Sequence, residues 1–340
     1  MPLPAGRFNG FTQIKTMNQY LPNEITVPEV QRLLQGGIGP RPIALVSTIS
    51  KDGINNLSPF SFYSVFGANP PVIGFSPSRR GKDGSLKDTY LNLIETKECV
   101  VQAVTYSMVE QVSLASTEYE KGIDEFIKSG LTPIDSDLIK PKRVKETPFQ
   151  MECKLLDMMS YGNGGASANI AICQVLKFHV AEDLFVNGII HPNRIDLVAR
   201  MSADFYCRAN GEAIFEVEKP IAKKGIGYDQ IPEFIKSSKV YSANNLGKLA
   251  NIESIPSIDS VNIYIQGVTK NSASDDKLKF IDFDKYKLLK DYWTMLKIIL
   301  QDSTLKSKDK RKLLEETAKV ALESNQTETA WKIALYAGRE

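Results

Sequence analysis

RPIALVSTI at residues 41–49 is an apolar, β-branched run of strand length, and the pair Asp52-Gly53 follows it. Asp-Gly is a strong signal for a tight β-hairpin, so a second strand is expected immediately afterwards. We predict that strand over residues 56–66, with the side chains of Phe60, Phe62 and Phe66 on one face. The opening of the sheet is therefore a hairpin with an aromatic face.

The segment that follows the hairpin predicts a binding cradle. Pro59 lacks the amide hydrogen that a central strand needs, so we expect the second strand at a sheet edge or with a bulge. Residues 72–76 predict a third strand, and residues 77–87 form a loop rich in glycine, serine and cations. Asp88 and Thr89 are predicted to cap a helix that runs to residue 96. A basic loop beside a helix N-terminus is typical of a site for a flat ligand with an anionic tail.

Short strands dominate the middle of the chain. Further strands are predicted over residues 99–104, 149–157, 169–180 and 184–190, with small helices around residues 107–114 and 124–128. No helix pattern follows the glycine-rich residues 162–165, so we interpret them as a hairpin loop rather than a phosphate loop. This pattern favours an antiparallel barrel over a parallel doubly wound sheet.

The last third of the chain changes character. One more strand is predicted at residues 261–265, and apolar spacing predicts helices over residues 283–301, 308–324 and 328–336. Ser307 and Thr327 are their expected caps, and Trp293 and Trp331 are interpreted as packing residues. We predict three regions: an N-terminal arm at 1–24, a barrel domain at 25–224 and a mostly helical extension at 225–340.

Composition excludes several classes of function. The 42 Lys and Arg residues against 40 Asp and Glu residues leave a net charge of +2, which gives no global reason to expect nucleic acid or membrane partners. The four cysteines form no Cys-x-x-Cys pair and lie near apolar runs, and only two histidines, His179 and His191, accompany them. We therefore expect reduced core thiols, structural histidines, no zinc site and a cytoplasmic location. No run approaches the length of a membrane helix.

The motifs at residues 41–48, 56–62, 70–76 and 87–89 with Asn92, taken in this order, resemble the flavin reductase-like FMN-binding split barrel family, which includes the flavoredoxins. Weaker similarity continues at 130–133, 148–155 and 198–200, so the resemblance covers about residues 25–220. It implies a mainly β protein with added helices, in which an antiparallel Greek-key split barrel is followed by the C-terminal helical extension. It also implies a homodimer with the flavin near the subunit interface.

The resemblance further implies FMN as cofactor and NADH or NADPH as electron donor. Hydride transfer by ring stacking needs positioning rather than an acid, base or nucleophile, so no catalytic residue is assigned. Arg80 and Lys82 compete with Arg79 and Lys87 for the phosphate, and Arg200 either forms a salt bridge or approaches the ligand from the other subunit. The implied cofactor-binding residues are Ser47, Thr48, Asn56, Leu57, Ser58, Ser61, Phe62, Ser76, Arg79, Lys87, Asp88, Thr89 and Asn92.

Alternatives to an NAD(P)H-dependent flavin reductase remain open at this point. A flavoredoxin-like electron carrier would hold FMN tightly, whereas a reductase could supply reduced flavin to a partner monooxygenase. A non-catalytic flavin-binding or sensory module would use the helical extension to contact a partner protein. A related split barrel enzyme acting on pyridoxamine phosphate or haem is a further rival. Phe60, Phe62 and Phe66 could also be ordinary core-face aromatics, and the basic loop an ordinary solvated loop.

Overall fold

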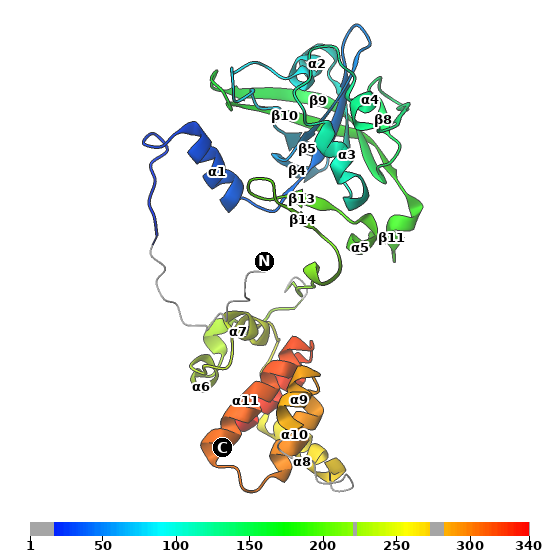
Figure 1. The fold of residues 1–340 in the computed structure, drawn as a ribbon. Coiled ribbons are helices and arrows are strands. Elements are labelled where there is room, and N and C mark those ends of the chain that lie inside the picture. Colours follow the sequence, from blue (N-terminus) through cyan, green and yellow to red (C-terminus); the bar gives the residue numbers. More distant parts are fainter. Residues whose placement is uncertain (1–16, 220–222, 273–281, 340) are drawn as a thin grey trace. The chain divides into compact units, whose positions relative to one another are not determined.

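The computed structural model describes residues 17–219, 223–272 and 282–339, and the chain divides into two compact units (Figure 1). One unit comprises Asn18–Glu216, and the other includes Val217–Glu340. The predicted N-terminal arm lies largely outside the described residues, and the domain limits of 25–224 and 225–340 remain predictions. Among the described residues, none of the helices combines the length and the apolar character needed to cross a membrane.

The first unit is built on a seven-stranded sheet in which every neighbouring pair is antiparallel. The strand order is β3-β2-β6-β9-β10-β5-β4. This confirms the antiparallel architecture that the short strands predicted. The strands are β2 (Ala44–Ile49), β3 (Asn55–Phe60), β4 (Tyr63–Ala68), β5 (Pro71–Phe75), β6 (Glu98–Ala103), β9 (Phe149–Tyr161) and β10 (Ala168–Val180).

Strands β3 and β4 are consecutive in sequence but lie at opposite edges of the sheet. Only Ser61 and Phe62 connect them, and so short a connection spans roughly 10 Å at most. The sheet must therefore curl until its two edges nearly meet, although these edges are not hydrogen-bonded to each other. This is the geometry of a barrel that is split along one side.

This crossing corrects the prediction of one continuous strand over residues 56–66. Because the chain turns at Ser61 and Phe62, the three phenylalanines do not share a face: Phe60 is buried, whereas Phe62 and Phe66 are exposed. The expectation that Pro59 lies in an edge strand is confirmed, since β3 pairs only with β2.

Two apolar clusters hold the first unit together. One fills the interior of the curled sheet and includes Phe60 and Phe75, whose ring centroids are 5.5 Å apart. The other packs the hairpin β2-β3 against α3 (Val109–Leu114) and α4 (Glu125–Ser129). All four cysteines are free; three are buried and Cys207 is half-buried, as expected of reduced thiols in apolar surroundings.

Smaller elements frame the barrel. A three-stranded sheet joins β1 (Arg41–Pro42), β13 (Val198–Arg200) and β14 (Tyr206–Arg208) in the order β1-β13-β14. The strand predicted at residues 184–190 is instead a hairpin of two very short strands, because Gly188 turns the chain with φ of 79°. The other elements are α1 (Val27–Gly37), α2 (Asp88–Thr96), β7 (Pro133–Ile134), β8 (Arg143–Val144), β11 (Phe185–Val186), β12 (Ile189–Ile190) and α5 (Pro192–Ile195).

The second unit is helical in its described part. Its apolar core surrounds Trp331, which is fully buried and donates its indole N–H to the carbonyl of Leu249 at 3.0 Å, so the packing role predicted for this residue is confirmed. The helices are α6 (Glu233–Lys236), α7 (Ala243–Ala250), α8 (Ile258–Ser272), α9 (Phe283–Leu288), α10 (Tyr292–Gln301), α11 (Ser307–Glu323) and α12 (Thr327–Ala337).

Three expectations for this unit were wrong. The strand predicted at residues 261–265 lies within α8, where Val261, Ile265 and Val268 are buried at helical spacing. The helix predicted over residues 283–301 breaks after α9, because Lys290 has φ of 57°. The caps of α11 and α12 are the residues before Ser307 and Thr327, which already belong to the helices.

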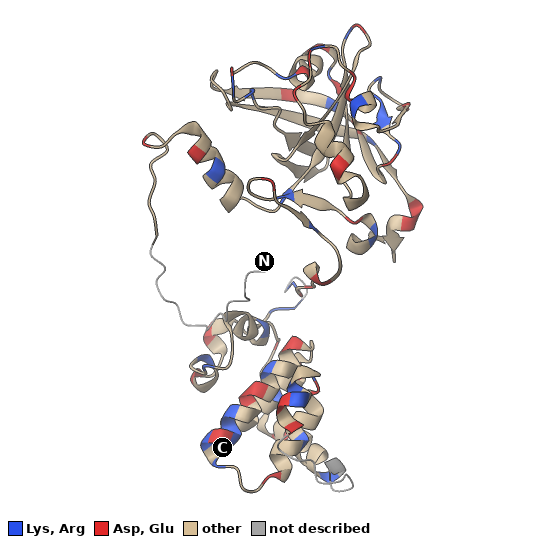
Figure 2. Cartoon of the chain, in the orientation of Figure 1, with Lys and Arg blue, Asp and Glu red and all other residues tan. Residues whose placement is uncertain are grey.

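Charges are mixed along the helical unit rather than gathered by sign. Figure 2 shows cationic and acidic residues interspersed along α11. Arg311 pairs with Glu315 at 3.1 Å within this helix, and Glu316 accepts from Lys287 at 2.6 Å. These pairs agree with the near-neutral composition of the whole chain.

Candidate functional site

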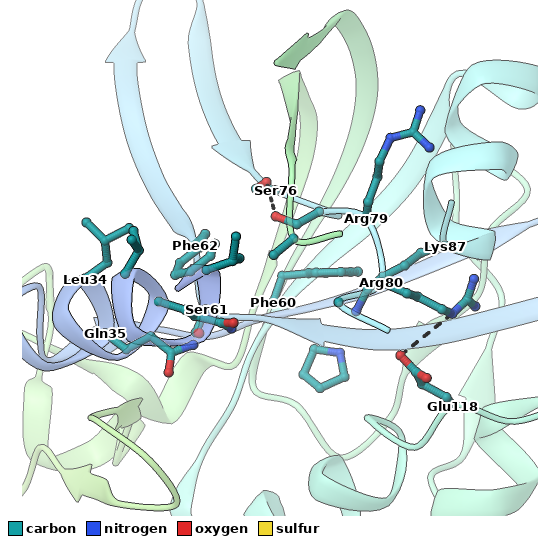
Figure 3. A pocket seen from close by; sticks show the side chains of 17 residues that line it. Leu34, Gln35, Phe60, Ser61, Phe62, Ser76, Arg79, Arg80, Lys87 and Glu118 are labelled. Atoms are coloured by element: carbon teal, nitrogen blue, oxygen red, sulfur yellow. Dashed lines mark hydrogen bonds and ion pairs between the residues drawn. The ribbon is translucent and has the colours of Figure 1, made fainter. Parts of the chain in front are cut away.

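The candidate site is an open cavity of about 340 Å³ in the first unit, next to the β3-β4 crossing (Figure 3). Its wall combines apolar side chains from α1 and β3 with a cationic loop that follows β5. The lining residues are Val27, Val30, Gln31, Leu34, Gln35, Pro59, Phe60, Ser61, Phe62, Ser76, Ser78, Arg79, Arg80, Gly81, Lys87, Glu118 and Ala166. The cavity is therefore apolar at one end and cationic at the other.

The cationic loop is fixed by backbone contacts. The amide of Arg79 donates to the carbonyl of Ser167 at 3.0 Å, and its Nη1 donates to the carbonyl of Gly84 at 2.8 Å. The Nε of Arg79 is buried without a hydrogen-bond partner among the described residues. The loop thus holds one guanidinium whose donors are only partly used.

The connection between β9 and β10 packs directly on this loop. A Cβ at Gly165 would lie 2.4 Å from the carbonyl oxygen of Gly81, so only glycine permits this approach of the two backbones. Asn169 also donates from Nδ2 to the carbonyl of Pro77 at 3.2 Å. Residues 162–165 are a hairpin connection, as the sequence predicted, and they support the cationic loop from behind.

Lys87 contributes a half-buried ammonium to the cavity wall. Its ammonium nitrogen lies 5.5 Å from the ring centroid of Phe60. Within the described part of the chain this ammonium has no hydrogen bond or ion pair. Its burial lowers the pKa of the ammonium, partly offset by the nearby carboxylate of Glu118. A half-buried ammonium that lacks a partner is the arrangement expected where an anionic ligand supplies the missing hydrogen bonds.

The start of α2 differs from the sequence prediction. Lys87 occupies the N-cap position, and Asp88 and Thr89 are the first two residues of the helix rather than caps. The carboxylate of Asp88 instead forms an ion pair with Arg80 at 3.4 Å. The correction follows from the extended backbone of Lys87, which places the helix boundary one residue earlier than the side-chain pattern indicated.

Four of the predicted ligand residues form a buried polar network outside the cavity wall. The Oδ1 of Asn56 accepts from Thr48 at 3.1 Å and from Thr89 at 2.8 Å, and Asn92 donates to the Thr48 hydroxyl at 3.1 Å. All four residues are buried and none lines the cavity. The network fastens α2 to the hairpin β2-β3, so it fixes where the helix begins.

Glu125 completes this network from α4. Its carboxylate accepts from the Nδ2 of Asn56 at 3.2 Å and from the amide of Leu57 at 2.9 Å. Burial raises the pKa of this carboxyl, although those hydrogen bonds act in the opposite direction. Of the other predicted residues, Ser47 donates to the carbonyl of Lys142 and Ser58 is half-buried, and neither lines the cavity.

The structure brings five predicted residues into the cavity wall: Ser61, Phe62, Ser76, Arg79 and Lys87. The competing cation Arg80 also lines it, whereas Lys82 is exposed and does not. The sequence-based interpretation missed the contribution of α1 and of Glu118. The signal for α1 was the spacing of its apolar residues, which places Val27, Val30 and Leu34 on one face.

A buried arginine holds α1 beside the cavity. The guanidinium of Arg41 donates to the carbonyls of Gln35 at 2.6 Å, Ile38 at 2.7 Å and Met201 at 2.8 Å. It also lies 6.0 Å from the ring centroid of Phe62. One side chain therefore links the end of α1, the cavity aromatic and the segment after β13.

The two histidines have structural contacts. The buried carboxylate of Glu152 is hydrogen-bonded to Nε2 of His179 at 2.7 Å and accepts from the amides of Asp137 at 2.8 Å and Leu138 at 2.7 Å. This cluster ties the loop before β8 to the barrel. His191 accepts from the amide of Asn193 at the start of α5, so both residues have the structural contacts that the sequence analysis expected.

Arg200 has surface contacts on β14 and the turn before it. It donates to the hydroxyl of Tyr206 at 2.6 Å and pairs with Asp204 at 3.4 Å. The salt bridge that the sequence left open for Arg200 is therefore present, and its approach to the ligand from the other subunit stays a prediction.

Known proteins resemble the first unit. The flavin reductase like domain family matches residues 37–194. An uncharacterized protein of Halalkalibacterium halodurans is 36% identical over 201 residues, which cover 58% of this chain and 95% of that protein. The crystal structure of nitrilotriacetate monooxygenase component B from Bacillus cereus is 33% identical, covers 59% of this chain and 99% of that one, and has a TM-score of 0.56.

A protein of Shewanella frigidimarina with a split barrel domain is also similar, at 25% identity over 58% of this chain and 96% of that one, with a TM-score of 0.50. The family match ends at residue 194, before the helical unit begins. The curled antiparallel sheet, the motifs along it and these matches agree. The chain belongs to the flavin reductase like domain family, and its first unit carries that domain.

Proposed function

We propose that this protein binds FMN in the cavity of its first unit and reduces it with NADH or NADPH. The observation that carries the proposal is Lys87, a half-buried ammonium at the cavity wall that has no hydrogen bond or ion pair among the described residues. An anionic tail such as the FMN phosphate would supply the missing acceptors. The family supports flavin binding, because its model is that of a flavin reductase like domain and one similar structure is that of a flavin reductase-like protein with a split barrel domain.

The residues present fit FMN. The phosphate would lie with Lys87 and the incompletely bonded guanidinium of Arg79, and the Ser76 hydroxyl lies beside them in the wall. The flavin ring would lie at the apolar end, with Ser61 and Phe62. When bound, the flavin supplies the hydride-accepting chemistry, and the chain's own residues hold and orient the two reactants.

The buried network of Thr48, Asn56, Thr89 and Asn92 would act one step further from the ligand. Its hydrogen bonds set the start of α2, and Lys87 stands at that boundary. We assign these four residues a positioning role in place of direct contact, because their side chains satisfy one another in the protein interior.

Assembly is part of the proposal. Strand β4 is an edge strand, and its side chains Val65 and Phe66 are 71% and 64% exposed. A second copy of the chain would cover such an apolar edge, which favours a homodimer. The similarity to a monooxygenase component B suggests a monooxygenase as the consumer of reduced flavin. The free cysteines fit the reducing cytoplasm.

The alternative within the same site is an electron carrier that keeps its FMN. The same cavity fits this function equally well, because the wall residues would hold a retained flavin and a released flavin alike. The two functions differ in the rate of flavin release, so they require the same residues.

An anaerobic titration tests the proposal. The purified protein is mixed with excess FMN and then with NADH or NADPH, while the absorbance of oxidised flavin is followed. Loss of that absorbance with catalytic amounts of protein supports the reductase and identifies its donor. Binding of FMN without accelerated reduction would favour the electron carrier, and absence of flavin binding would refute the site.

A further inference from the structure

The cationic end of the cavity contains one carboxylate that the flavin proposal does not use, that of Glu118. This residue lies in the segment between α3 and α4, and its Oε1 is 3.8 Å from Nε of Arg80. The side chain is 60% exposed, whereas that of Arg80 is 21% exposed. Figure 3 shows the two side chains facing each other across the cavity wall.

Arg80 does not depend on Glu118 for its position. Its Nη1 donates to the carbonyl of Leu86 at 2.5 Å, and its Nη2 lies 3.4 Å from the carboxylate of Asp88. Both partners belong to the cationic loop or to α2. Glu118, in contrast, has Arg80 as its only hydrogen-bonding or ion-pair partner in the described chain, and no hydrogen bond holds its backbone.

The local charges explain why this difference matters. Arg79, Arg80 and Lys87 bring three positive charges to this end of the cavity, and Asp88 and Glu118 bring two negative ones. The sum is +1, which is too small to neutralise the charge of roughly −1.5 to −2 that a phosphate monoester carries at neutral pH. Without Glu118 the sum would be +2, which matches a phosphate dianion.

We propose that Glu118 is an internal counter-anion that a ligand phosphate displaces, and that it determines how strongly the site distinguishes FMN from riboflavin. In the unliganded site the carboxylate neutralises Arg80. When a phosphate enters, like-charge repulsion and the loss of its cation drive Glu118 away from the cavity. This inference rests on the proposed flavin site and adds a specificity-determining residue to it.

The test compares two flavins that differ only in the phosphate. Quenching of flavin fluorescence gives the Kd of FMN and of riboflavin for the wild-type chain, Glu118→Gln and the control Glu120→Gln. Glu120 lies on the same exposed segment and has no side-chain partner among the described residues. Glu118→Gln should tighten FMN binding about two- to fivefold, the range of an exposed ion pair, and leave riboflavin binding unchanged.

The gain should shrink as salt is raised, since exposed charges are screened. Equal tightening of both flavins, or no change in FMN binding while the wild-type chain still binds FMN, would overturn the role of Glu118 and leave the flavin site standing. The same gain in Glu120→Gln would also overturn it, because a general charge effect would then explain the data. A wild-type chain that binds neither flavin would refute the flavin site and this inference together.

Discussion

Replacing Lys87 with methionine should separate ligand binding from folding. The substitution keeps an unbranched apolar stem beside Phe60 and removes the ammonium that lies 5.5 Å from that ring. A hydrogen bond to a charged group contributes about 1.5–3 kcal/mol. Because a factor of ten in Kd corresponds to about 1.4 kcal/mol, FMN binding should weaken about 10- to 150-fold. Riboflavin binding should change little, since riboflavin has no phosphate.

The thermal stability of the ligand-free Lys87→Met variant should rise or stay unchanged, although its FMN affinity falls. Burial disfavours the charged form of Lys87 and lowers its pKa, and the nearby carboxylate of Glu118 offsets this effect only in part. Thermal unfolding of the ligand-free variant should therefore occur at the wild-type temperature or above it.

Lys82→Met is the matched control, because Lys82 is exposed on the same loop and does not line the cavity. Fluorescence titrations of FMN and riboflavin give the two affinities for each variant. An equal loss of affinity for FMN and for riboflavin in Lys87→Met would refute a phosphate contact. An FMN affinity in Lys82→Met that falls as far as in Lys87→Met would show that only general loop charge matters.

Three further predictions concern the scaffold. Trp331→Ala should lower the free energy of unfolding of the helical unit by about 3–5 kcal/mol, measured by chemical denaturation, while FMN binding persists; a loss below 1 kcal/mol would contradict the assigned core. Gly165→Ala should weaken FMN binding, because its Cβ would lie 2.4 Å from the oxygen of Gly81 and push the cationic loop; unchanged affinity in titrations would argue against this support. Burial alone would raise the pKa of Glu152, but its hydrogen bonds from two amides and His179 hold it below the ordinary value of 4.5. Its stabilisation is therefore present above that value and lost as pH falls through the lower folded pKa, so Glu152→Gln should show a shallower loss of stability in acid denaturation than the wild type.

The cationic end of the site was readable from sequence because its parts are local. Arg79 and Lys87 lie on one loop that ends at the first turn of α2, and turn residues and cations mark such a loop directly. The hairpin β2-β3 was readable for the same reason. In both cases the information lies within about ten neighbouring residues.

The missed features depend on distant parts of the chain. The sequence around Ser61 and Phe62 does not indicate that β3 and β4 lie at opposite edges of the sheet. That separation is created by β6, β9 and β10, which come later in the chain. The place of helix α1 at the cavity depends on Arg41, which binds the carbonyl of Gln35 at the end of α1 and that of Met201 after β13. A β-branched run such as residues 261–265 fits a strand or a buried helix, and packing decided for the helix.

The short crossing between β3 and β4 also dictates when the cavity can form during folding. The residues that line it are mostly close in sequence, yet the distance between β3 and β4 is set by strands that end only at Val180. Loop-closure entropy makes such non-local pairings slow to form. The hairpin β2-β3 can form early in folding, but the cavity can form only after β9 and β10 have completed the sheet. Flavin capture during refolding would therefore report the arrival of the last strands rather than collapse of the first.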